Sequence, residues 1–426
     1  MASPRSAAAV ILARLSPELE VFWMRRSPQM MFQGGFYAFP GGQLDPNEDS
    51  KVCAARELFE EVGVRVDPSA LIDVGRWVTP AFAPRRFDTC FFLAECPPGE
   101  EARVMTGEHD IGEWIRPADA VAKWMEGQIL MAPPIRHALQ CLAEGLVDIE
   151  ARMKASPWAH GEPITEIGMR PGIVLVPVRT PTLPPATHTN CYVIGGDEVV
   201  VIDPASPYEE EQAVLDRVLE KRKIREIWLT HMHRDHVGGA NHLREKRGVK
   251  VVAHPITARD LDGVVKVDRT FEENERLELP GKPGWSLRVL HTPGHARGHV
   301  CIFEEKNGSL LTGDLMAGLG TIVIDPPEGH MATYFDSLNR MKALPVTALF
   351  PAHGPVMANA KGKIQEYLDH RMEREAKILA AWEKGHREPG AIVKDVYTDV
   401  APAMYGLAER SVMAHLEKLK EEGRLA

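Results

Sequence analysis

The chain has 426 residues, 44% of them hydrophobic and 26% charged, and its formal net charge is −10. This length predicts two or three domains. The negative net charge argues against a protein that works mainly by coating nucleic acid, but it does not exclude a local basic groove. The six cysteines are scattered without a CxxC pair, which favours free thiols in a reducing compartment. No apolar run is long enough to predict a membrane span, so we expect a cytoplasmic chain without membrane contact.

Two apolar segments open the chain. Residues 7–13 and 20–26 have the composition of strands, and Ser16-Pro17 predicts a turn between them. Because Arg14 interrupts the first apolar run, we interpret the segment as part of a folded domain and not as a signal peptide.

An acidic motif follows these strands. It reads G-x5-E-x7-R-E-U-x-E-E-x-G-U, where U is an apolar residue, and its fixed letters are Gly42, Glu48, Arg56, Glu57, Glu60, Glu61 and Gly63. Asp49 or Ser50 can cap a helix that runs to about Val62. The last three glutamates of the motif then share one helix face, because they are three and four residues apart.

Three crowded carboxylates repel one another unless cations neutralise them. Oxygen ligands of this kind select Mg²⁺ or Mn²⁺, which in turn bind the phosphates of a substrate, and Arg56 can orient a neighbouring carboxylate. A solvated acidic helix face would leave Gly42, Arg56 and Gly63 without an explanation.

This motif resembles the Nudix box, and residues 5–151 look like a Nudix hydrolase domain of α/β/α fold. The resemblance implies metal-dependent cleavage of a nucleoside diphosphate linked to another moiety. It implies that Glu57, Glu60 and Glu61 are metal ligands and that Glu57 is a catalytic residue that helps to deprotonate the attacking water. The catalytic base in such domains often lies outside the box, where Glu108 and Glu113 are candidates and an exposed loop carboxylate is the simpler interpretation of either.

Two segments beside the box narrow the substrate. MRRSPQMMFQGGFYAFPGG and WVTPAFAPRRFDTCFFLAE are similar to the peroxisomal-type branch linked to coenzyme A diphosphate cleavage. Arg85 and Arg86 could bind phosphates, since guanidinium groups chelate them well; an ordinary surface pair is an equally good explanation. Apolar periodicity is lost after this region, and we place a linker at residues 152–168.

A histidine cluster dominates the rest of the chain. Strands are predicted at 172–178, 191–195, 198–203 and 227–229, with a helix at 209–223. The sequence LTHMHRDHVGGA follows at residues 229–240 and contains His231, His233, Asp235 and His236. Buried imidazole and carboxylate groups cost free energy unless they are paired or bind a metal, so this density predicts a metal site.

Further candidate ligands stand at later exits from predicted strands, at His295, Asp314 and His353. Strand ends of this kind can converge on one edge of a sheet sandwich. We therefore predict two metal sites: one of His231, His233 and His295, the other of Asp235, His236 and His353, with Asp314 bridging them. Such a site leaves a position for a water that two cations would convert to hydroxide near neutral pH. A set of satisfied loop histidines is the alternative, and seven matching positions in order argue against it.

THMHRDH, followed by TPGH, GD and PAHG, resembles the metallo-β-lactamase superfamily. The resemblance covers residues 169–360 and implies an αββα sandwich with two Zn²⁺, in which Asp203 matches a structural aspartate and Asp235 is a catalytic candidate. His299 is expected to support the site and His291 to be a strand residue. Ala296 stands where threonine is common, and we expect no effect on ligation.

Residues 361–426 predict two helices, at 367–385 and 408–425. This tail looks like the small winged-helix-like appendage of the β-lactamase-like protein 2 group. Because its charge is nearly balanced, we favour a lid or packing subdomain over a nucleic-acid-binding one. His370 and Arg371 are candidates to face the metal cleft.

These patterns favour a fusion of two hydrolases, in which the zinc site attacks an ester or thioester through a bridging hydroxide and the Nudix site acts on coenzyme A or a related diphosphate. An endoribonuclease is the first alternative, with RNA as partner. It requires a basic track, for which residues 221–225 and 244–250 are candidates if they are not simply solvated faces. A scaffold protein with a dead site is the second, and the intact ligand sets argue against it. A homodimer is compatible with the sequence.

Overall fold

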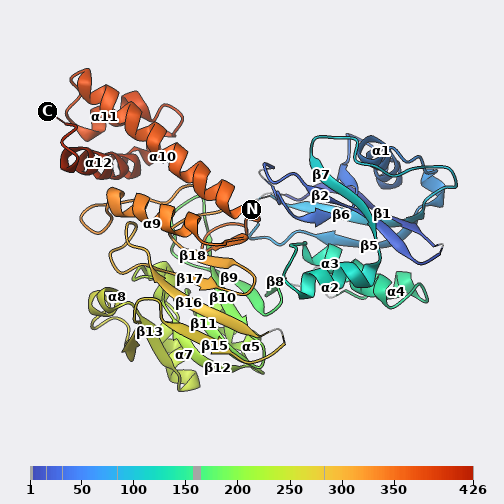
Figure 1. Cartoon of the computed structure of the whole chain (residues 1–426), viewed down its shortest axis with the longest axis horizontal. Helices are drawn as coiled ribbons and strands as arrows, with labels where there is room; N and C mark the ends of the chain where they lie inside the picture. Colours follow the sequence, from blue (N-terminus) through green and yellow to red (C-terminus); the bar gives the residue numbers. More distant parts are fainter. Residues whose placement is uncertain are drawn as a thin grey trace. The chain divides into compact units, whose positions relative to one another are not determined.

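The computed structural model describes residues 3–15, 17–30, 32–83, 85–156, 165–282 and 284–425. The chain forms two compact units, Met1–Leu175 and Val176–Ala426 (Figure 1). In the described part of the chain, no helix is long and apolar enough to cross a membrane.

The first unit is built on one seven-stranded sheet. The path β3-β2-β1-β6-β5 carries two further strands, β4 paired with β1 and β7 paired with β2. The strands are β1 (Arg5–Arg14), β2 (Glu20–Arg26), β3 (Tyr37–Ala38), β4 (Gly41–Gln43), β5 (Ile72–Val78), β6 (Phe87–Glu95) and β7 (His109–Ile115). The helices are α1 (Ser50–Val62), α2 (Pro117–Met125), α3 (Pro133–Ala143) and α4 (Ile149–Lys154), with a short 3-10 turn η1 (Pro68–Ala70).

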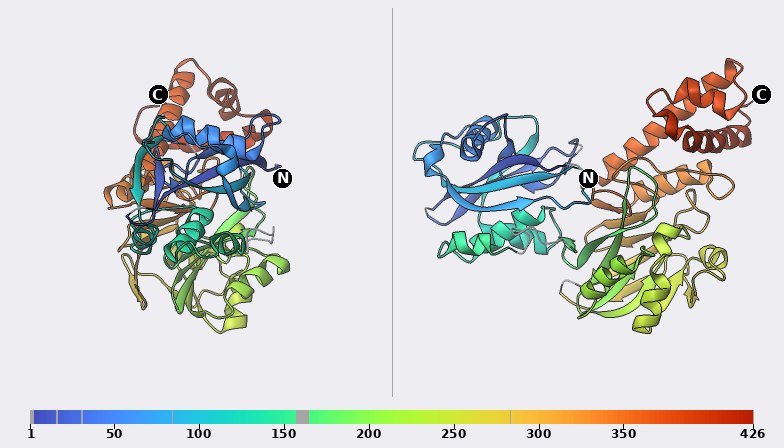
Figure 2. Two further views of the ribbon diagram at one scale, coloured as in Figure 1. Left: turned by 90° about the vertical axis from the view of Figure 1, so that its right-hand side faces the viewer. Right: turned by 180° about the vertical axis from the view of Figure 1, so that it is seen from behind.

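Side-chain alternation along β1 explains why this sheet is covered on both faces. Ala8, Val10 and Leu12 enter the core beneath α1. Ala9 and Ile11 enter the other core, with the side chains of α2 and α3. Successive residues of a strand point to opposite faces, so an uninterrupted apolar run indicates a strand buried on both sides. The result is the predicted α/β/α arrangement (Figure 2).

The predicted strands at 7–13 and 20–26 are confirmed as β1 and β2, and the predicted turn at Ser16-Pro17 falls partly outside the described residues, at Ser16. The predicted linker at 152–168 contains the end of α4 and the start of β8 (Ile167–Arg170), and residues 157–164 lie outside the described part. The compact units divide between Leu175 and Val176. The domain boundaries drawn from the sequence stay predictions.

The strands from β8 onwards form two sheets. The first has the order β14-β13-β12-β11-β10-β9-β8 and the second the order β15-β16-β17-β18-β19. The first sheet uses β8, β9 (Ile173–Arg179), β10 (His188–Gly195), β11 (Glu198–Ile202), β12 (Lys223–Trp228), β13 (Lys250–Ala253) and β14 (Arg269–Thr270). The second uses β15 (Arg276–Leu279), β16 (Trp285–His291), β17 (Val300–Glu304), β18 (Ser309–Gly313) and β19 (Ala348–Pro351).

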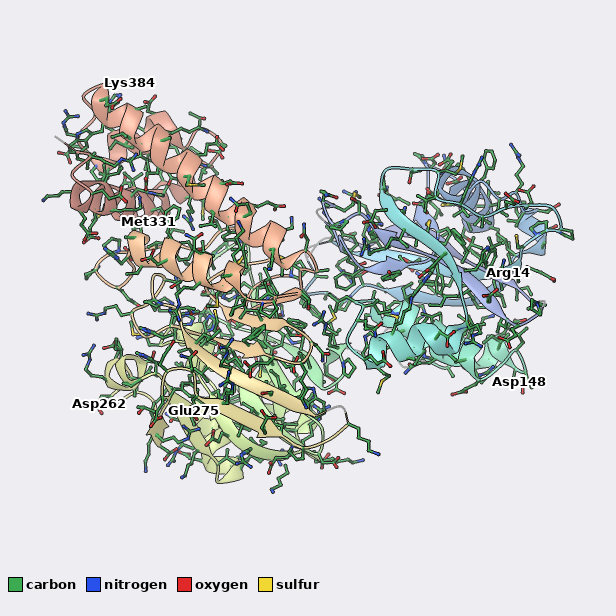
Figure 3. All side chains as sticks on the ribbon, viewed as in Figure 1. Arg14, Asp148, Asp262, Glu275, Met331 and Lys384 are labelled. Atoms are coloured by element: carbon green, nitrogen blue, oxygen red, sulfur yellow. The ribbon has the colours of Figure 1, made fainter. Side chains whose placement is uncertain are left out.

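Hydrogen bonds join the two sheets beside the strand ends that carry the histidines. The Asn190 amide and the Tyr192 hydroxyl of β10 both donate to the carbonyl of Pro351 in β19, at 2.9 and 2.8 Å. Helices α9 (Met331–Ala343) and α10 (Ala360–Glu383) cover the second sheet with buried side chains such as Leu338 and Ile364. Figure 3 labels Met331 at the start of α9 and Lys384 just beyond α10. The predicted αββα sandwich is thereby formed.

Four helices accompany the first sheet: α5 (Glu209–Val218), α6 (Arg234–Val237), α7 (Ala240–Arg247) and α8 (Pro255–Asp260). The helix predicted at 209–223 is too long. It ends at Val218, and the Lys223 N–H donates to the carbonyl of Asp197 and so starts β12. The helical pattern of the sequence continues past the point where the sheet captures the backbone.

The C-terminal subdomain, residues 384–425, packs against the second half of α10. It contains α11 (Pro389–Val396), the 3-10 turn η2 (Pro402–Met404) and α12 (Tyr405–Glu421). Ile378 of α10, Val393 of α11 and Val412 of α12 are fully buried in their shared core. Both predicted helices of the tail are present, as α10 and α12.

Candidate metal centres and active-site cavity

Asp203 fixes the loop that carries the first histidines. It follows β11 with a φ of 49°. Its carboxylate accepts hydrogen bonds from the Thr230 N–H at 2.8 Å, the Thr230 hydroxyl at 2.6 Å and His236 Nδ1 at 2.8 Å. The Thr230 hydroxyl in turn lies 3.0 Å from His231 Nδ1. These bonds occupy the Nδ1 atoms of both histidines, which leaves their Nε2 atoms free to bind a metal.

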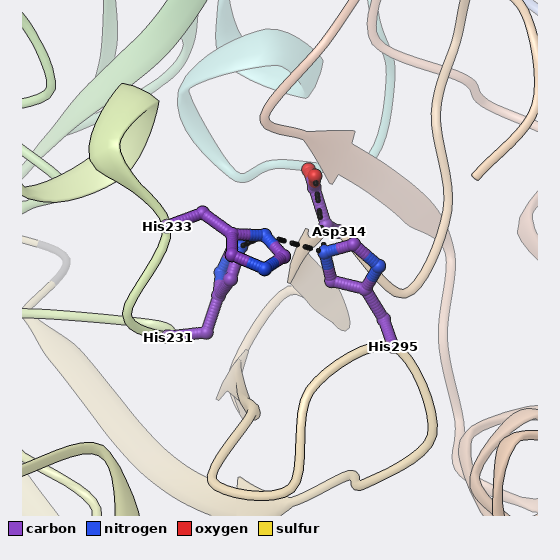
Figure 4. Close-up of side chains that lie close together, drawn as sticks. All are labelled: His231, His233, His295 and Asp314. Atoms are coloured by element: carbon purple, nitrogen blue, oxygen red, sulfur yellow. Dashed lines mark hydrogen bonds and ion pairs between the residues drawn. The ribbon is translucent and has the colours of Figure 1, made fainter. Parts of the chain in front are cut away.

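Three imidazoles and a carboxylate meet in the first predicted site (Figure 4). His233 Nδ1 lies 3.0 Å from both His231 Nε2 and His295 Nε2. Asp314 Oδ2 lies 3.6 Å from His295 Nε2. The four ligand atoms are all within 4.8 Å of one another. The other nitrogen of His295 contacts the carbonyl of Val323 at 2.8 Å, which fixes the ring orientation.

The second predicted site consists of Asp235, His236 and His353, whose ligand atoms also lie within 4.8 Å of one another. His353 Nε2 is 3.5 Å from Asp235 Oδ2 and 3.4 Å from Asp314 Oδ1. His236 Nε2 is 3.6 Å from the same Asp314 oxygen. The two oxygens of Asp314 therefore face different sites, as expected of a bridging carboxylate.

Two buried polar atoms lie where the two predicted sites meet, and they indicate whether cations fit there. His236 Nε2 and Asp314 Oδ1 have no hydrogen-bond partner among the described residues. A buried polar atom without a partner costs about 1–3 kcal/mol, and a cation ligated by both atoms removes that cost. Burial alone would lower the pKa of His353, but the charges of Asp314 and Asp235 raise it to about 10. Nitrogen and carboxylate donors in this ratio suit two zinc ions.

Two further histidines are placed as predicted. The Asp314 N–H donates to His299 Nε2 at 3.0 Å, and His299 Nδ1 lies 2.8 Å from the Thr292 hydroxyl. His299 thus positions Asp314 and does not offer a free nitrogen. His291 ends β16 and stacks on His254, with ring centroids 4.1 Å apart.

Glu328 was not identified from the sequence. Its Oε1 lies 2.9 Å from His233 Nε2, the ring nitrogen opposite the metal-facing Nδ1. A carboxylate in this position orients a metal-bound histidine and raises its basicity. No spacing rule marks Glu328, because the loop before α9 brings it to His233 from 95 positions away along the chain.

A cavity of about 460 Å³ opens from the metal ligands. His233, Asp235, His295, Asp314 and His353 all line it. Segments 181–186 and 319–323, the residues Ala317, Asp325 and Glu328, and part of the C-terminal subdomain form the wall. Among the described lining residues Arg410 is the one lysine or arginine, and it is paired with Asp325.

His370 and Arg371 do not line this cavity, so the prediction that they face it is wrong. Arg371 is buried, and its guanidinium donates to the Ile322 carbonyl and to the Thr321 hydroxyl. Arg371 therefore supports the cavity wall from behind, which the helical spacing of α10 did not reveal.

The acidic face of the first unit is arranged differently. The Asp49 side chain caps α1 by accepting from the Lys51 N–H, and Gly63 ends the helix with a φ of 79°. Arg56 binds Glu48 through two nitrogens at 2.9 Å each. The same guanidinium donates to Glu57 at 2.9 Å and to Glu60 at 3.1 Å.

A steric contact explains why glycine occupies position 42. A Cβ at this position would lie 2.3 Å from the Glu57 carboxylate oxygen, which is closer than atoms can approach. Glu61 accepts from the Gly41 N–H at 2.9 Å. Burial raises the pKa of Glu61 to about 7, although that hydrogen bond opposes the shift. Carboxylates are donors that Mg²⁺ or Mn²⁺ prefers, but among the described residues the clusters whose ligand atoms lie within 4.8 Å of one another are both in the second unit.

The structure separates the two candidate bases outside the Nudix box. Glu108 is close enough to Glu61 for its charge to raise the Glu61 pKa. Glu113 instead accepts from the Trp23 indole at 3.3 Å, and Trp23 belongs to the core on the sheet face away from α1. Glu108 remains a candidate, whereas Glu113 lies on the wrong face.

Two predicted basic features are largely engaged in protein contacts. Arg86 donates to the carbonyl of Thr79 at 3.1 Å, while Arg85 is exposed. Of the candidate basic track, Lys223 and Arg225 both pair with Glu198. The second stretch is paired as well, through Arg244–Asp268 and Lys246–Asp216.

Comparison with known families covers both units. Residues 4–134 match the NUDIX domain, residues 184–353 the metallo-beta-lactamase superfamily, and residues 389–426 the beta-lactamase associated winged helix domain. Together these matches define a metal-dependent hydrolase. The chain belongs to the metallo-β-lactamase superfamily and carries a NUDIX domain at its N-terminus.

Individual relatives within the superfamily have more specific names than the family itself. The chain is 32% identical over 258 residues to the beta-lactamase-like protein 2 homolog of Drosophila melanogaster, across 56% of this chain and 84% of that protein. It is 28% identical over 256 residues to an atrochrysone carboxyl ACP thioesterase of Paecilomyces divaricatus, across 56% and 76%. A crystal structure of a metallo-beta-lactamase family protein from Thermus thermophilus shares the fold, with a TM-score of 0.50, 24% identity, and coverage of 59% and 94%.

Proposed function

We propose that the metal centre of the second unit hydrolyses the thioester of an extended apolar acyl group. The observation that carries this proposal is the cavity beside the ligands, in which apolar side chains dominate and the one described cation is already paired with Asp325. An RNA backbone carries one negative charge per nucleotide and is bound through unpaired lysine and arginine. An acyl chain requires only apolar surface. The thioesterase name of a relative agrees with this choice.

The seven ligands would hold two zinc ions, which would supply the Lewis acidity that activates the attacking water near neutral pH. The residues of the chain would then orient the reactants. Asp235 is held by His353 and can accept a hydrogen bond from the attacking water. His299 and Glu328 keep Asp314 and His233 in position. The water oxygen forms the new C–O bond to the acyl carbon, the C–S bond breaks, and the thiol leaves with a proton.

For the NUDIX unit we propose cleavage of a nucleoside diphosphate compound, with coenzyme A as the leading candidate. Water attacks one phosphorus and the bridging P–O bond breaks, which gives two phosphomonoesters. Glu57, Glu60 and Glu61 would hold the cation, which neutralises charge on the phosphates. Thioester hydrolysis releases a thiol that carries this same diphosphate when the substrate is an acyl-coenzyme A, so the two reactions are chemically compatible.

The test uses the full chain with Zn²⁺ and Mg²⁺. Acyl-coenzyme A, acyl-pantetheine, ADP-ribose, a dinucleoside polyphosphate and single-stranded RNA are offered to wild type, Glu61→Gln and Asp235→Asn. We expect Asp235→Asn to abolish release of thiol and Glu61→Gln to abolish cleavage of the diphosphate. Hydrolysis of RNA alone would overturn the thioesterase proposal, and activity that survives both substitutions would overturn both proposals.

A further inference from the structure

We infer that the C-terminal subdomain is the wall that selects the length of the acyl chain. This inference rests on the proposed thioesterase function. It assigns a substrate contact to residues that stand more than 40 positions beyond the last metal ligand in the sequence. The subdomain is visible as the red helices α11 and α12 in Figure 1.

The subdomain contributes apolar side chains to the same cavity that the metal ligands line. They come from the end of α11, the η2 turn and the first turn of α12: Tyr397, Val400, Met404, Leu407 and Ala408. Each belongs to the second compact unit, as do all the metal ligands. An acyl carbonyl placed at the metal centre therefore has its chain between these ligands and α12.

Two other segments that line the cavity are also apolar. Leu183, in the segment after β9, lines it while 53% of its surface is exposed. Ile322 and Val323 add a second apolar stretch. Exposed leucine surface is unfavourable in water by about 25 cal/mol per Å², and an alkyl chain in the cavity would cover it. Two apolar walls beside a polar metal end fit a ligand with one polar end and one hydrocarbon end.

Ion pairs tie the subdomain to the rest of the unit, so that the wall has a fixed position. Arg410 of α12 pairs with Asp325 in the loop before α9. Glu421, at the end of α12, lies 3.1 Å from His330 at the start of α9. These exposed pairs add little by themselves, but α12 also packs with α10 and α11 in one buried core, and a close-packed core resists displacement. We therefore expect discrimination by chain length and not a general tolerance.

The experiment changes the volume of the wall at Leu407. Leu407→Trp fills part of the cavity and Leu407→Ala enlarges it. Met413→Trp is the matched control, because Met413 lies on the same helix, is 46% exposed and does not line the cavity. The probes are acyl-pantetheine thioesters with acetyl, octanoyl and palmitoyl groups, which carry no nucleotide. Binding of free dodecanoate to each zinc-loaded protein is measured in parallel.

We expect Leu407→Trp to reduce kcat/KM for the longer chains by about tenfold or more, because the loss of space for even one methylene group in an apolar pocket has an effect of this size. The kcat/KM for the acetyl substrate should change little. Leu407→Ala should shift the preference towards palmitoyl, and Met413→Trp should match wild type. Equal losses for all chain lengths in Leu407→Trp, with Leu407→Ala unchanged, would overturn the inference. If wild type hydrolyses no thioester, the proposed function is wrong. Dodecanoate binding that is lost in Leu407→Trp alone would then still show that Leu407 lines the site for the hydrocarbon chain.

Discussion

The two hydrolase units hold their charged side chains in different ways. In the second unit seven ligands from four separate chain segments converge, and a buried nitrogen and a buried carboxylate oxygen lack partners there among the described residues. In the NUDIX unit the carboxylates come from one helix, and Arg56 of that helix already contacts two of them. In the second unit, the fold therefore brings the ligand atoms together. In the NUDIX unit, a metal must compete with Arg56 for the carboxylates, so we expect weaker metal binding there.

The largest expected effect separates the two centres. Asp314→Asn removes the charge shared by the two candidate metal sites and should reduce the proposed thioester hydrolysis by about 10³-fold or more, with diphosphate cleavage unchanged. Glu61→Gln should give the reverse result. Steady-state assays of both reactions on each variant, together with zinc content, provide the measurement. Loss of both activities in either variant would show that the units do not act independently.

A steric change tests the NUDIX unit alone. Gly42→Ala forces a Cβ against the Glu57 carboxylate and should reduce diphosphate cleavage by about 10²-fold through displacement of that group. Gly107→Ala is the control, because a Cβ at Gly107 meets no atom within 4 Å. Thioester hydrolysis should not change in either variant. Full diphosphatase activity in Gly42→Ala would mean that Glu57 can move without consequence.

The sequence predicted both centres because their residues lie in short motifs at characteristic positions. The Nudix box lies on one helix, where spacing alone determines which side chains share a face. The metal ligands of the second unit stand at strand exits, whose convergence follows from the sandwich. In the second unit the structure brings these residues together, whereas the metal ligands of the Nudix box stay a prediction.

The residues missed by the sequence are those that depend on long-range packing. Glu328 reaches His233 only because the loop before α9 folds over the site. Arg371 looked like a cleft residue on an amphipathic helix, yet it is buried behind the loop at Ile322. Glu113 looked equivalent to Glu108 until the strand pairing placed it opposite Trp23. Composition and spacing do not reveal which distant segment packs against a side chain, or on which face of a sheet it lies.

Glu328 gives a smaller, more specific test of the pre-assembled centre. Glu328→Gln removes the charge behind His233 and should weaken zinc affinity by about 10–100-fold, the usual effect of a carboxylate that supports a metal-bound histidine. Glu421→Gln is the control, since Glu421 pairs with His330, which is not a ligand. Competition with a zinc chelator measures the affinity. Equal effects of the two substitutions would show that Glu328 acts only through stability.

The smallest expected effect is a difference in pH response, measured on the metal-free chain. Burial raises the pKa of Glu61 to about 7 from an ordinary value of 4.5, so the stability of α1 should decrease as the pH rises from about 4.5 to about 7. Burial opposes the ionised form of Glu375 in α10, but its contacts with His415 and Lys418 of α12 lower its pKa to about 2. The stability of α12 should therefore decrease as the pH falls from about 4.5 towards 2.

Hydrogen exchange of α1 and α12, corrected for intrinsic rates, reports each helix separately. Glu61→Gln should remove the loss at high pH in α1, and Glu375→Gln the loss at low pH in α12, each by about 1–2 kcal/mol. Each variant serves as the control for the other helix. A common pH profile for both helices would contradict the opposite environments of these carboxylates, because burial dominates at Glu61 and Glu375 lies 2.9 Å from Lys418.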